Sequence, residues 1–276
     1  MTVPNTFKMM YNSYEMDTKI CVRGVSPMPQ LRLDKYLSEL GVASRRELRE
    51  IIRSGRVCVD GVCVRDEGQR IDAQRASVSL DGRTLHYSRF QYYMLDKPLG
   101  VITATEDREQ KTVLDLLPPE LRAAGLFPVG RLDKDTSGLL LLTNDGDFAH
   151  RVIAPKSEVW KRYLARVDGV PDEADAAAFR EGLVLADGTR CLSAVLEVSG
   201  EESCAVLVQE GKYHQVRRML AARGKSVLSL RRVAIGALPL DETLGPGGFR
   251  VLSEEERSLV FARPSSLPET KSTEKQ

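Results

Sequence analysis

The apolar positions of the chain fall into short groups that differ in spacing. Leu33, Leu37 and Leu40 follow one another at helical intervals, so they predict a short amphipathic helix that Gly41 can end. Residues 139–142, by contrast, are four consecutive leucines followed by polar residues. Such a run is too short for a buried helix and predicts a strand covered on both faces. The loop directly before it would be held rigidly against the core.

A second amphipathic helix is predicted directly after the first. Ser44 and Glu47 have the spacing of a capping box, and Leu48 with Ile51 and Ile52 supplies the apolar face. The opposite face is basic, because arginines recur at intervals of four: Arg45, Arg49 and Arg53.

A β-hairpin follows these helices. Residues 57–59 and 62–64 both read Val-Cys-Val and flank Asp60-Gly61, a strong signal for a two-residue turn. The hairpin would place Cys58 opposite Cys63, close enough in principle for a disulfide. We expect both thiols to stay reduced, because disulfides are rare in a reducing cytoplasm.

Beyond residue 85 the apolar segments alternate between strand and helix patterns. Strands are expected over residues 92–95, 159–167, 183–185, 194–198, 205–209 and within 223–240, and a short apolar piece, residues 100–102, follows the first of them. Helices are expected over 112–117, 121–124, 148–153 and 171–181, the last of them facing solvent, and a final strand and helix follow residue 248. Residues 1–29 and 264–276 lack periodicity, so we expect flexible ends, and translation could begin at Met28.

The positive charge of the chain is concentrated in two regions. The 276 residues have a net charge of +1, which by itself says nothing about nucleic acid. However, residues 32–65 contain eight Lys and Arg against five Asp and Glu, and residues 210–232 contain seven against one. Two local basic regions favour two contacts with a polyanion, although each could be a solvated helix face.

Metal and membrane signals are weak. The five cysteines have no Cys-x-x-Cys spacing, and the three histidines lie far apart, so we expect no structural metal site. No apolar run approaches the length of a membrane span, and the N-terminus has no secretory pattern. We expect a cytoplasmic protein without membrane contact.

The most chemically specific stretch is the polar loop before the four leucines. Asp133, Asp135 and Ser137 alternate before Gly138, as in the first half of a calcium-binding loop. The twelfth position holds Asn144 where that loop needs a bidentate Glu, so calcium is the weaker alternative. An ordinary charged turn is a second alternative.

The same stretch reads Gly-Arg-Leu-Asp-x-x-Thr-x-Gly-Leu-Leu-Leu-Leu-Thr-Asn-Asp-Gly from Gly130, and it resembles the signature of the RsuA-like pseudouridine synthases that modify ribosomal RNA. The resemblance implies that Asp133 is the catalytic carboxylate and that Arg131 holds the opened RNA. Residues 96–101 also resemble the family's Asn-Lys-Pro-x-Gly-Val element, with Asp96 in place of Asn. There Lys97 could contact a phosphate, or it could be an ordinary exposed lysine in a turn.

Two further elements resemble those of the family. Lys161-x-Tyr163 matches the second, which implies that Tyr163 packs on the target base, although strands often contain core tyrosines. Residues 210–220 match the third, which implies that Arg217 contacts the catalytic carboxylate. We expect further RNA contacts from its neighbours: Lys212, Tyr213, His214 and Arg218.

The N-terminal arrangement of helix, basic helix and hairpin resembles the S4 RNA-binding domain. By charge, five of its arginines would lie along phosphates: Arg32, Arg45, Arg46, Arg49 and Arg53. We therefore predict an α+β protein with an S4-like domain over residues 30–85 and a linker over 86–91. A pseudouridine synthase domain with a mixed, largely antiparallel sheet would occupy residues 92–263.

In the implied reaction, the bond from the sugar to a nitrogen of uracil is broken, and the same sugar carbon is joined to a ring carbon of the uracil. The reaction therefore requires no cofactor, donor or metal. An ionised Asp133 could attack the sugar or assist glycal formation. An arginine about 4 Å away, at an effective dielectric near 20, contributes roughly 4 kcal/mol. Arg217 could therefore offset the desolvation of Asp133. Asp135 is the weaker candidate, since the family's Asp directly follows Arg-Leu.

The finer details most resemble the RsuA enzymes, which act on one uridine of 16S rRNA. The residues that resemble them are His150 to Lys156, the Gly-Lys-Tyr-His-Gln-Val form of the third element, and Leu244 to Leu252. This implies a monomer acting on ribosomal RNA within a partly assembled small subunit. A 23S rRNA synthase and a non-catalytic RNA-binding protein on the same scaffold are the alternatives.

Overall fold

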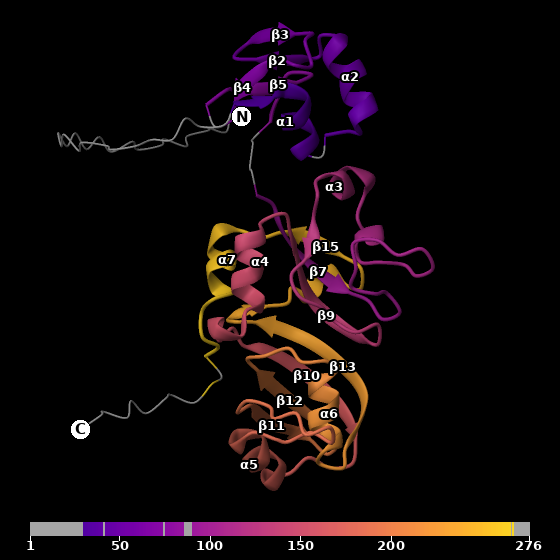
Figure 1. Cartoon of the computed structure of the whole chain (residues 1–276), viewed down its shortest axis with the longest axis vertical. Helices are drawn as coiled ribbons and strands as arrows, with labels where there is room; N and C mark the ends of the chain where they lie inside the picture. The colour runs from indigo at the N-terminus through magenta and orange to yellow at the C-terminus, as the bar shows by residue number, and fades with distance from the viewer. Residues whose placement is uncertain (1–29, 41, 74, 86–89, 266, 268–276) are drawn as a thin grey trace, which may run out of the picture.

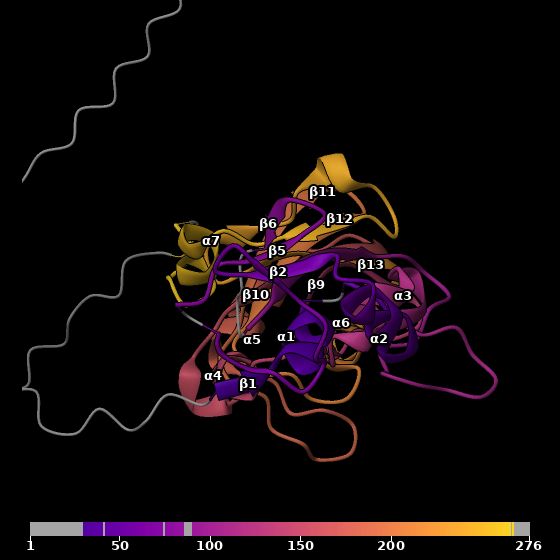
Figure 2. The same cartoon turned by 90° about the horizontal axis from the view of Figure 1, so that it is seen from above.

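The structure, a computed structural model, describes residues 30–40, 42–73, 75–85, 90–265 and 267. Figure 1 shows a small N-terminal region at one end of a long sheet, and in Figure 2 the same region lies nearest the viewer. The expectations for residues 1–29, for most of the linker and for residues 268–276 fall outside this range. Within the described residues, no helix is both long enough and apolar enough to cross a membrane.

The N-terminal region has the predicted helices and hairpin. The helices are α1 (Leu33–Glu39) and α2 (Arg45–Arg53), and α2 begins with the predicted capping box of Ser44 and Glu47. The strands β2 (Val57–Val59), β3 (Val62–Val64), β5 (Val78–Leu80) and β6 (Arg83–Leu85) form a sheet in the order β3-β2-β5-β6. A separate pair joins β1 (Gln30–Arg32) to β4 (Arg70–Asp72).

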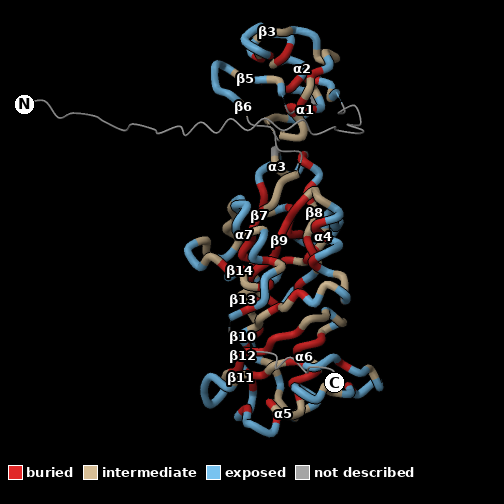
Figure 3. Tube along the Cα trace, turned by 90° about the vertical axis from the view of Figure 1, so that its left-hand side faces the viewer, coloured by how far each residue is buried: buried red, intermediate tan, exposed pale blue. Residues whose placement is uncertain are grey.

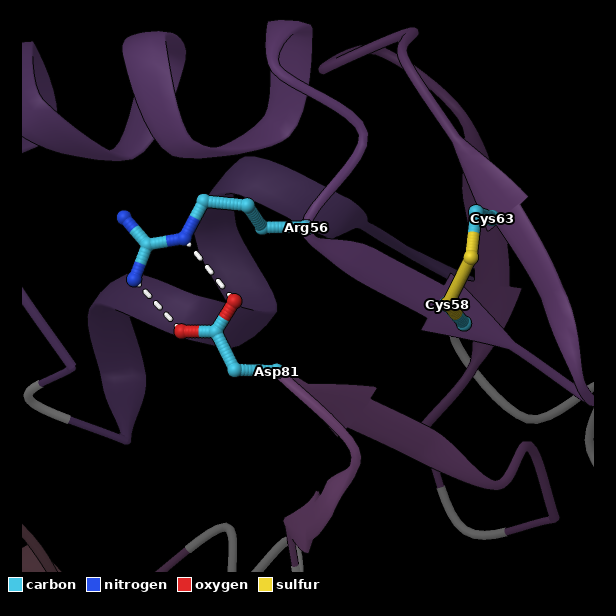
Figure 4. Close-up of a disulfide and its surroundings, with 4 residues drawn as sticks. All are labelled: Arg56, Cys58, Cys63 and Asp81. Carbon is cyan, nitrogen blue, oxygen red and sulfur yellow. Dashed lines mark hydrogen bonds and ion pairs between the residues drawn. A yellow bond between two sulfur atoms is a disulfide. The ribbon is translucent and has the colours of Figure 1, made fainter.

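The hairpin turn places the two cysteines opposite each other. Asp60 and Gly61 have φ angles of 50° and 82°, so both central turn residues are left-handed, as a two-residue hairpin requires. In this register Cys58 and Cys63 are direct partners, and they form a disulfide (Figure 4). The expectation of free thiols was therefore wrong. It rested on the cellular compartment, whereas the turn brings the two sulfur atoms together locally.

The large sheet has nine strands and is mixed but largely antiparallel, as predicted. Its order is β11-β12-β10-β13-β9-β7-β15, with β14 on β13 and β8 on β9. The strands are β7 (Tyr92–Lys97), β8 (Phe127–Pro128), β9 (Thr136–Thr143), β10 (Lys161–Asp168), β11 (Val195–Gly200), β12 (Ser203–Val208), β13 (Ser226–Ile235), β14 (Leu238–Pro239) and β15 (Phe249–Val251). Among these named strands only β9 and β13 pair in parallel.

Helices and short 3-10 turns surround this sheet. They are η1 (Leu114–Leu116), α3 (Pro119–Ala123), α4 (Gly146–Ile153), η2 (Pro155–Ser157), α5 (Glu173–Glu181), α6 (Gln215–Ala221), η3 (Glu242–Leu244) and α7 (Glu254–Leu259). The predicted helices at 148–153 and 171–181 are confirmed. The helix α6 was not predicted from the sequence.

Three local predictions were wrong. Residues 112–117 form only a 3-10 turn, and residues 183–185 form no strand because Val184 makes a single isolated bridge to Arg190. In addition, α5 does not simply face solvent. Asp175 and Phe179 on this helix are buried, because the helix packs against the sheet beside β11.

The four leucines form the centre of the core. Residues 139–142 are at most 1% exposed, and alternate leucines belong to two different hydrophobic clusters, so β9 is covered on both faces (Figure 3). At its start, β9 approaches β13 very closely. A Cβ atom on Gly138, whose φ is 104°, would lie 2.2 Å from the carbonyl oxygen of Arg232. Only glycine allows this approach, which places Arg232 beside the loop that precedes β9.

Candidate active site

The polar loop between β8 and β9 borders a cleft of about 830 Å³. The cleft is lined by this loop, by the start of β10, by the residues from the end of β12 into α6, and by β13. Asp133, Tyr163 and Arg217 all line it, although they come from three separate elements. The structure therefore brings the three predicted catalytic residues to one site.

Hydrogen bonds from neighbouring segments hold the loop in place. The backbone N–H of Leu132 donates to Thr103 Oγ1 at 3.1 Å, and the Thr103 hydroxyl donates back to the Leu132 carbonyl at 2.6 Å. Gly100 N–H donates to the Lys134 carbonyl at 2.8 Å. Leu132 itself is buried, whereas the neighbouring Asp133 side chain is 34% exposed. A reactive carboxylate on a rigidly held backbone suits catalysis.

His214 is the nearest basic group to Asp133. Its Nε2 lies 3.5 Å from Asp133 Oδ1, so the two form an ion pair whenever the imidazole is protonated. The backbone of His214 is left-handed, with a φ of 48°, directly before α6. Tyr213 stacks on the imidazole with ring centroids 4.0 Å apart, and it is 76% exposed. A stacked aromatic pair with an exposed outer ring therefore stands beside the carboxylate.

Arg217 does not contact Asp133, and that expectation was wrong. Its Nη2 lies 2.9 Å from both the carboxylate and the carbonyl oxygen of Asp135. The reason is geometric, because His214, one turn earlier in the chain, faces Asp133, while Arg217 reaches the start of β9. Arg217 therefore fixes the end of the loop, and Asp135, whose side chain is 60% exposed, is its anchor.

Lys97 is not at the surface, so the predicted phosphate contact is also wrong. It is the last residue of β7 and is completely buried, and its ammonium donates to the Thr136 carbonyl at 2.8 Å and to the Pro98 carbonyl at 3.0 Å. Burial lowers the pKa of Lys97 to about 8, while the negative charges of Asp133 and Asp135 oppose this shift. Lys97 therefore supplies positive charge from beneath the loop.

Tyr163 is a cleft residue rather than a fully buried core tyrosine. It lies on β10, is partly exposed, and packs against the core on one side. Its hydroxyl accepts a hydrogen bond from Arg232 Nη1 at 3.4 Å. In the strand register, Tyr163 is the Cα partner of Arg232 on β13. The remaining ring surface faces the cleft, where a planar base could stack.

Two cleft cations were overlooked in the sequence. Arg232 is 4% exposed and Lys161 is 8% exposed, and both line the cleft. Burial, together with the positive charge of Arg232, lowers the pKa of Lys161 to about 8. The Lys-x-Tyr element already contained Lys161, but Arg232 lay within a run interpreted only as a strand. The adjacent Arg231 instead forms a bidentate ion pair with the buried Asp96, at 2.8 and 3.0 Å.

The other proposed cleft contacts differ in their surroundings. Arg131 is exposed at the rim of the cleft. Lys212 pairs with Glu210, and Arg218 pairs with Asp187. Hydrogen bonds from Thr189 and then from Arg218 lower the pKa of Asp187 to about 2. Lys212 and Arg218 are therefore already neutralised by carboxylates of this chain.

The N-terminal arginines are mostly exposed, and their ion pairs lie at the surface. Arg32 pairs with Asp34 at 2.8 Å, and Arg49 and Arg53 lie 3.8 and 3.7 Å from Glu67. Arg46 is exposed, whereas the side chain of Arg45 is outside the described part of the structure. Exposed ion pairs of this kind contribute little, so these arginines can exchange their partners for phosphates.

The calcium-loop alternative is wrong. Ser137 and Gly138 belong to β9, so the oxygen atoms required by such a loop are built into a sheet. Within the described residues, no group of three or more His, Cys, Asp and Glu side chains could hold a metal ion.

Comparison with known proteins identifies the family. Residues 91–222 match the RNA pseudouridylate synthase family, and residues 31–75 match the S4 domain. The chain is 43% identical to the ribosomal small subunit pseudouridine synthase A of Vibrio cholerae over 84% of this chain and all of that protein. It is 40% identical to an uncharacterized RNA pseudouridine synthase of Bacillus subtilis, over 83% of this chain and 98% of that protein.

A solved structure supports the same conclusion. A crystal structure of a pseudouridylate synthase is 34% identical and superimposes with a TM-score of 0.60, covering 83% of this chain and 99% of that one. The chain therefore belongs to the RNA pseudouridine synthases of the RsuA type, isomerases in which an S4 domain precedes the catalytic domain.

Proposed function

We propose that this enzyme converts one uridine of 16S ribosomal RNA to pseudouridine, with Asp133 as the nucleophile. The observation that supports this most is the common cleft, which places the rigidly held Asp133 carboxylate and the Tyr163 ring in one cavity. The similarity to small subunit pseudouridine synthases of Vibrio cholerae and Salmonella typhimurium favours the 16S target.

In this proposal Asp133 acts on the anomeric carbon of the sugar, by direct attack or by assisting glycal formation. Lys97 lies beneath the loop, where its positive charge is attracted to the negative charge of Asp133. His214, 3.5 Å away, adds positive charge from the open side when it is protonated. Arg217 contributes indirectly, because it holds Asp135 and thus the end of the loop.

The RNA would be held by weaker contacts around this centre. Tyr163 would stack on the opened base, a contact that contributes about 1–3 kcal/mol in single-stranded complexes. Arg131 at the rim would contact the opened strand, and Tyr213 and His214 would contact neighbouring nucleotides. The exposed arginines Arg32, Arg46, Arg49 and Arg53, with Arg45 by position, would follow the phosphates.

We further propose that the enzyme acts as a cytoplasmic monomer on a small-subunit assembly intermediate. The domain division into residues 30–85, 86–91 and 92–263 belongs to the same proposal. Protein-bound RNA would present the target loop in a more regular geometry than free RNA.

Mapping pseudouridine across 16S and 23S rRNA, in a strain without this gene and in its complemented control, tests the proposal. We expect one 16S position to lose its pseudouridine and to regain it on complementation. Loss of a 23S position with 16S unchanged would overturn the substrate, and no change in either RNA would overturn the ribosomal assignment.

A further inference from the structure

Three polar groups at the floor of the cleft have unused hydrogen-bonding capacity. Arg232 donates from Nε to the Leu139 carbonyl at 2.8 Å and from Nη1 to the Tyr163 hydroxyl at 3.4 Å. Its buried Nη2, however, has no partner among the described residues, and neither does the buried hydroxyl of Thr136. Within the described residues, the Lys161 ammonium has three donor hydrogens and makes one hydrogen bond, to the Gln209 carbonyl at 3.2 Å. Unused buried donors indicate a ligand with acceptor oxygens.

The positive charge of this floor also indicates an electron-rich ligand. Arg232 and Lys161 are both buried, and within the described residues no carboxylate lies within ion-pair distance of either. Desolvating a cation without a counter-charge costs several kcal/mol. Placing a second cation nearby increases that cost, so the arrangement is unfavourable until an electron-rich group enters. The ligand should therefore carry partial or full negative charge when it occupies the floor.

We propose that Arg232 and Lys161 bind the carbonyl oxygens of the target uracil and stabilise the negative charge that develops on the base when it leaves the sugar. This assignment rests on the proposed function, and it adds residues that act on the base to Asp133, which acts on the sugar. The apolar side chains of Val208, Leu230 and Ile235 line the same floor. Such walls suit a planar heterocycle better than a hydrated phosphate.

The position of Tyr163 supports the base rather than the backbone as the ligand. The guanidinium carbon of Arg232 lies 5.9 Å from the centre of the Tyr163 ring. A base stacked on this ring would direct an edge toward the guanidinium and its unused Nη2. Phosphates would meet Arg131, which is exposed at the rim.

The electron pair left on uracil by the broken bond requires a site that binds negative charge. Breaking the bond between the anomeric carbon and N1 leaves the electron pair on uracil, where it spreads over N1, O2 and O4. The sugar carbon is meanwhile bonded to Asp133, or becomes part of a glycal after loss of the proton on the adjacent carbon. When ring carbon C5 re-forms the bond to the anomeric carbon, the same electron pair is used. The bond to Asp133 then breaks and its electrons return to the carboxylate, or the glycal regains the proton on its adjacent carbon. The proton lost from C5 is matched by one gained at N1, so no further reagent is consumed. Hydrogen-bond donors aimed at the developing charge are the usual means of lowering such a barrier.

The first test measures binding of barbiturate, an anionic pyrimidine with uracil-like carbonyl groups, and of neutral uracil to the full-length protein by calorimetry. We expect the wild type to prefer barbiturate by about tenfold or more, the factor for one charge-assisted hydrogen bond. Arg232→Met and Lys161→Met should each reduce this preference. Arg166→Met, the same change at an exposed arginine on β10, should retain it.

Several results would overturn the proposal: no preference in the wild type, an unchanged preference in Arg232→Met, or equal displacement of barbiturate by inorganic phosphate. Thermal melting identifies any variant that fails to fold. If Arg232→Met does not fold, Lys161→Met decides alone, because the same loss of preference is expected of it.

Activity on rRNA provides an independent readout. We expect Arg232→Met to lower kcat by about a hundredfold while KM for RNA changes by less than about threefold, because the affinity resides elsewhere. A rise in KM at constant kcat would contradict the proposal. If the wild type prefers barbiturate but modifies no rRNA, the proposed function fails while the uracil site stands. Active enzyme without that preference refutes the uracil site alone.

Discussion

The N-terminal region and the catalytic cleft use positive charge in opposite ways. On α2 the side chains of Arg49 and Arg53 are 63% and 68% exposed and lie nearly 4 Å from a shared glutamate. In the cleft region Lys97, Lys161 and Arg232 are at most 8% exposed and donate to carbonyl oxygens. Exposed charges are mobile and screened, so they suit affinity for many phosphates. Buried charges are held rigidly and are costly, so they suit chemistry at one site.

The difference between the two regions can be tested most directly at the cleft. Asp133→Asn should reduce pseudouridine formation by about a thousandfold or more, since the shape is kept and the anionic group is lost. RNA affinity should stay within about threefold, because the phosphate contacts remain. Single-turnover assays with a filter-binding measurement check both statements.

Asp135→Asn is the matched control for this change. It removes the charge of an exposed carboxylate that pairs with Arg217, and exposed pairs contribute about 1 kcal/mol or less, so activity should fall by less than about fivefold. Activity of Asp133→Asn within tenfold of the wild type would contradict the assignment of the catalytic carboxylate.

The exposed arginines should affect affinity without affecting the chemical step. The triple variant Arg46→Ala, Arg49→Ala and Arg53→Ala should weaken RNA binding by about tenfold to a hundredfold at physiological salt. Its logarithmic salt slope should flatten by roughly two to three units, nearly one per lost phosphate contact. Titrations over a range of salt concentrations measure both quantities.

Arg180→Ala on α5 is the control, because this exposed arginine also pairs with a glutamate but lies outside both proposed RNA surfaces. It should leave the salt slope unchanged. An unchanged slope in the triple variant as well would mean that the arginines of α2 are only a solvated face.

The buried lysines should make stability depend on pH. Burial lowers the folded-state pKa of Lys97 to about 8 from an ordinary value of 10.5. Between these values the unfolded chain binds more protons than the folded one, so this lysine makes the protein more stable as pH rises. From pH 8 to 9.5 the free energy of unfolding should rise by roughly 1–2 kcal/mol relative to Lys97→Met.

Denaturant titrations at several pH values compare the two proteins directly. Restricting the range to below pH 9.5 avoids Tyr36, Tyr92 and Tyr93, whose pKa values are raised and whose contribution has the opposite sign. Parallel curves for the wild type and Lys97→Met would show that Lys97 does not titrate in this window.

The smallest effect is expected at the hairpin. Reducing the bond between Cys58 and Cys63 should lower the stability of the N-terminal region by about 1 kcal/mol or less, because the bond closes only a short loop that the turn already holds. Thermal unfolding of wild type and Cys58→Ser, each with and without reductant, measures this. A loss of several kcal/mol in the reduced wild type would contradict it.

Local sequence determined much of this protein. The capping box of α2, the Asp-Gly turn and the four leucines of β9 are short-range signals, and each produced the predicted element because its physical cause lies within a few residues. The signature loop likewise identified Asp133, and the second element identified Tyr163, both of which line the cleft. The Val-Cys-Val repeat also set the pairing of the two cysteines, although we did not expect the bond.

Only the tertiary structure decided which charged groups meet. Arg232 reaches Tyr163 across 69 residues, and Arg231 reaches Asp96 across 135. Arg217 faces Asp135 rather than Asp133, and Lys97 is enclosed instead of exposed. These outcomes follow from the order and register of β10, β13, β9 and β7 in one sheet. A local pattern can predict that a strand forms. Which strands become its neighbours depends on how all the strands together bury their apolar faces. Those neighbours determine where each charged side chain lies.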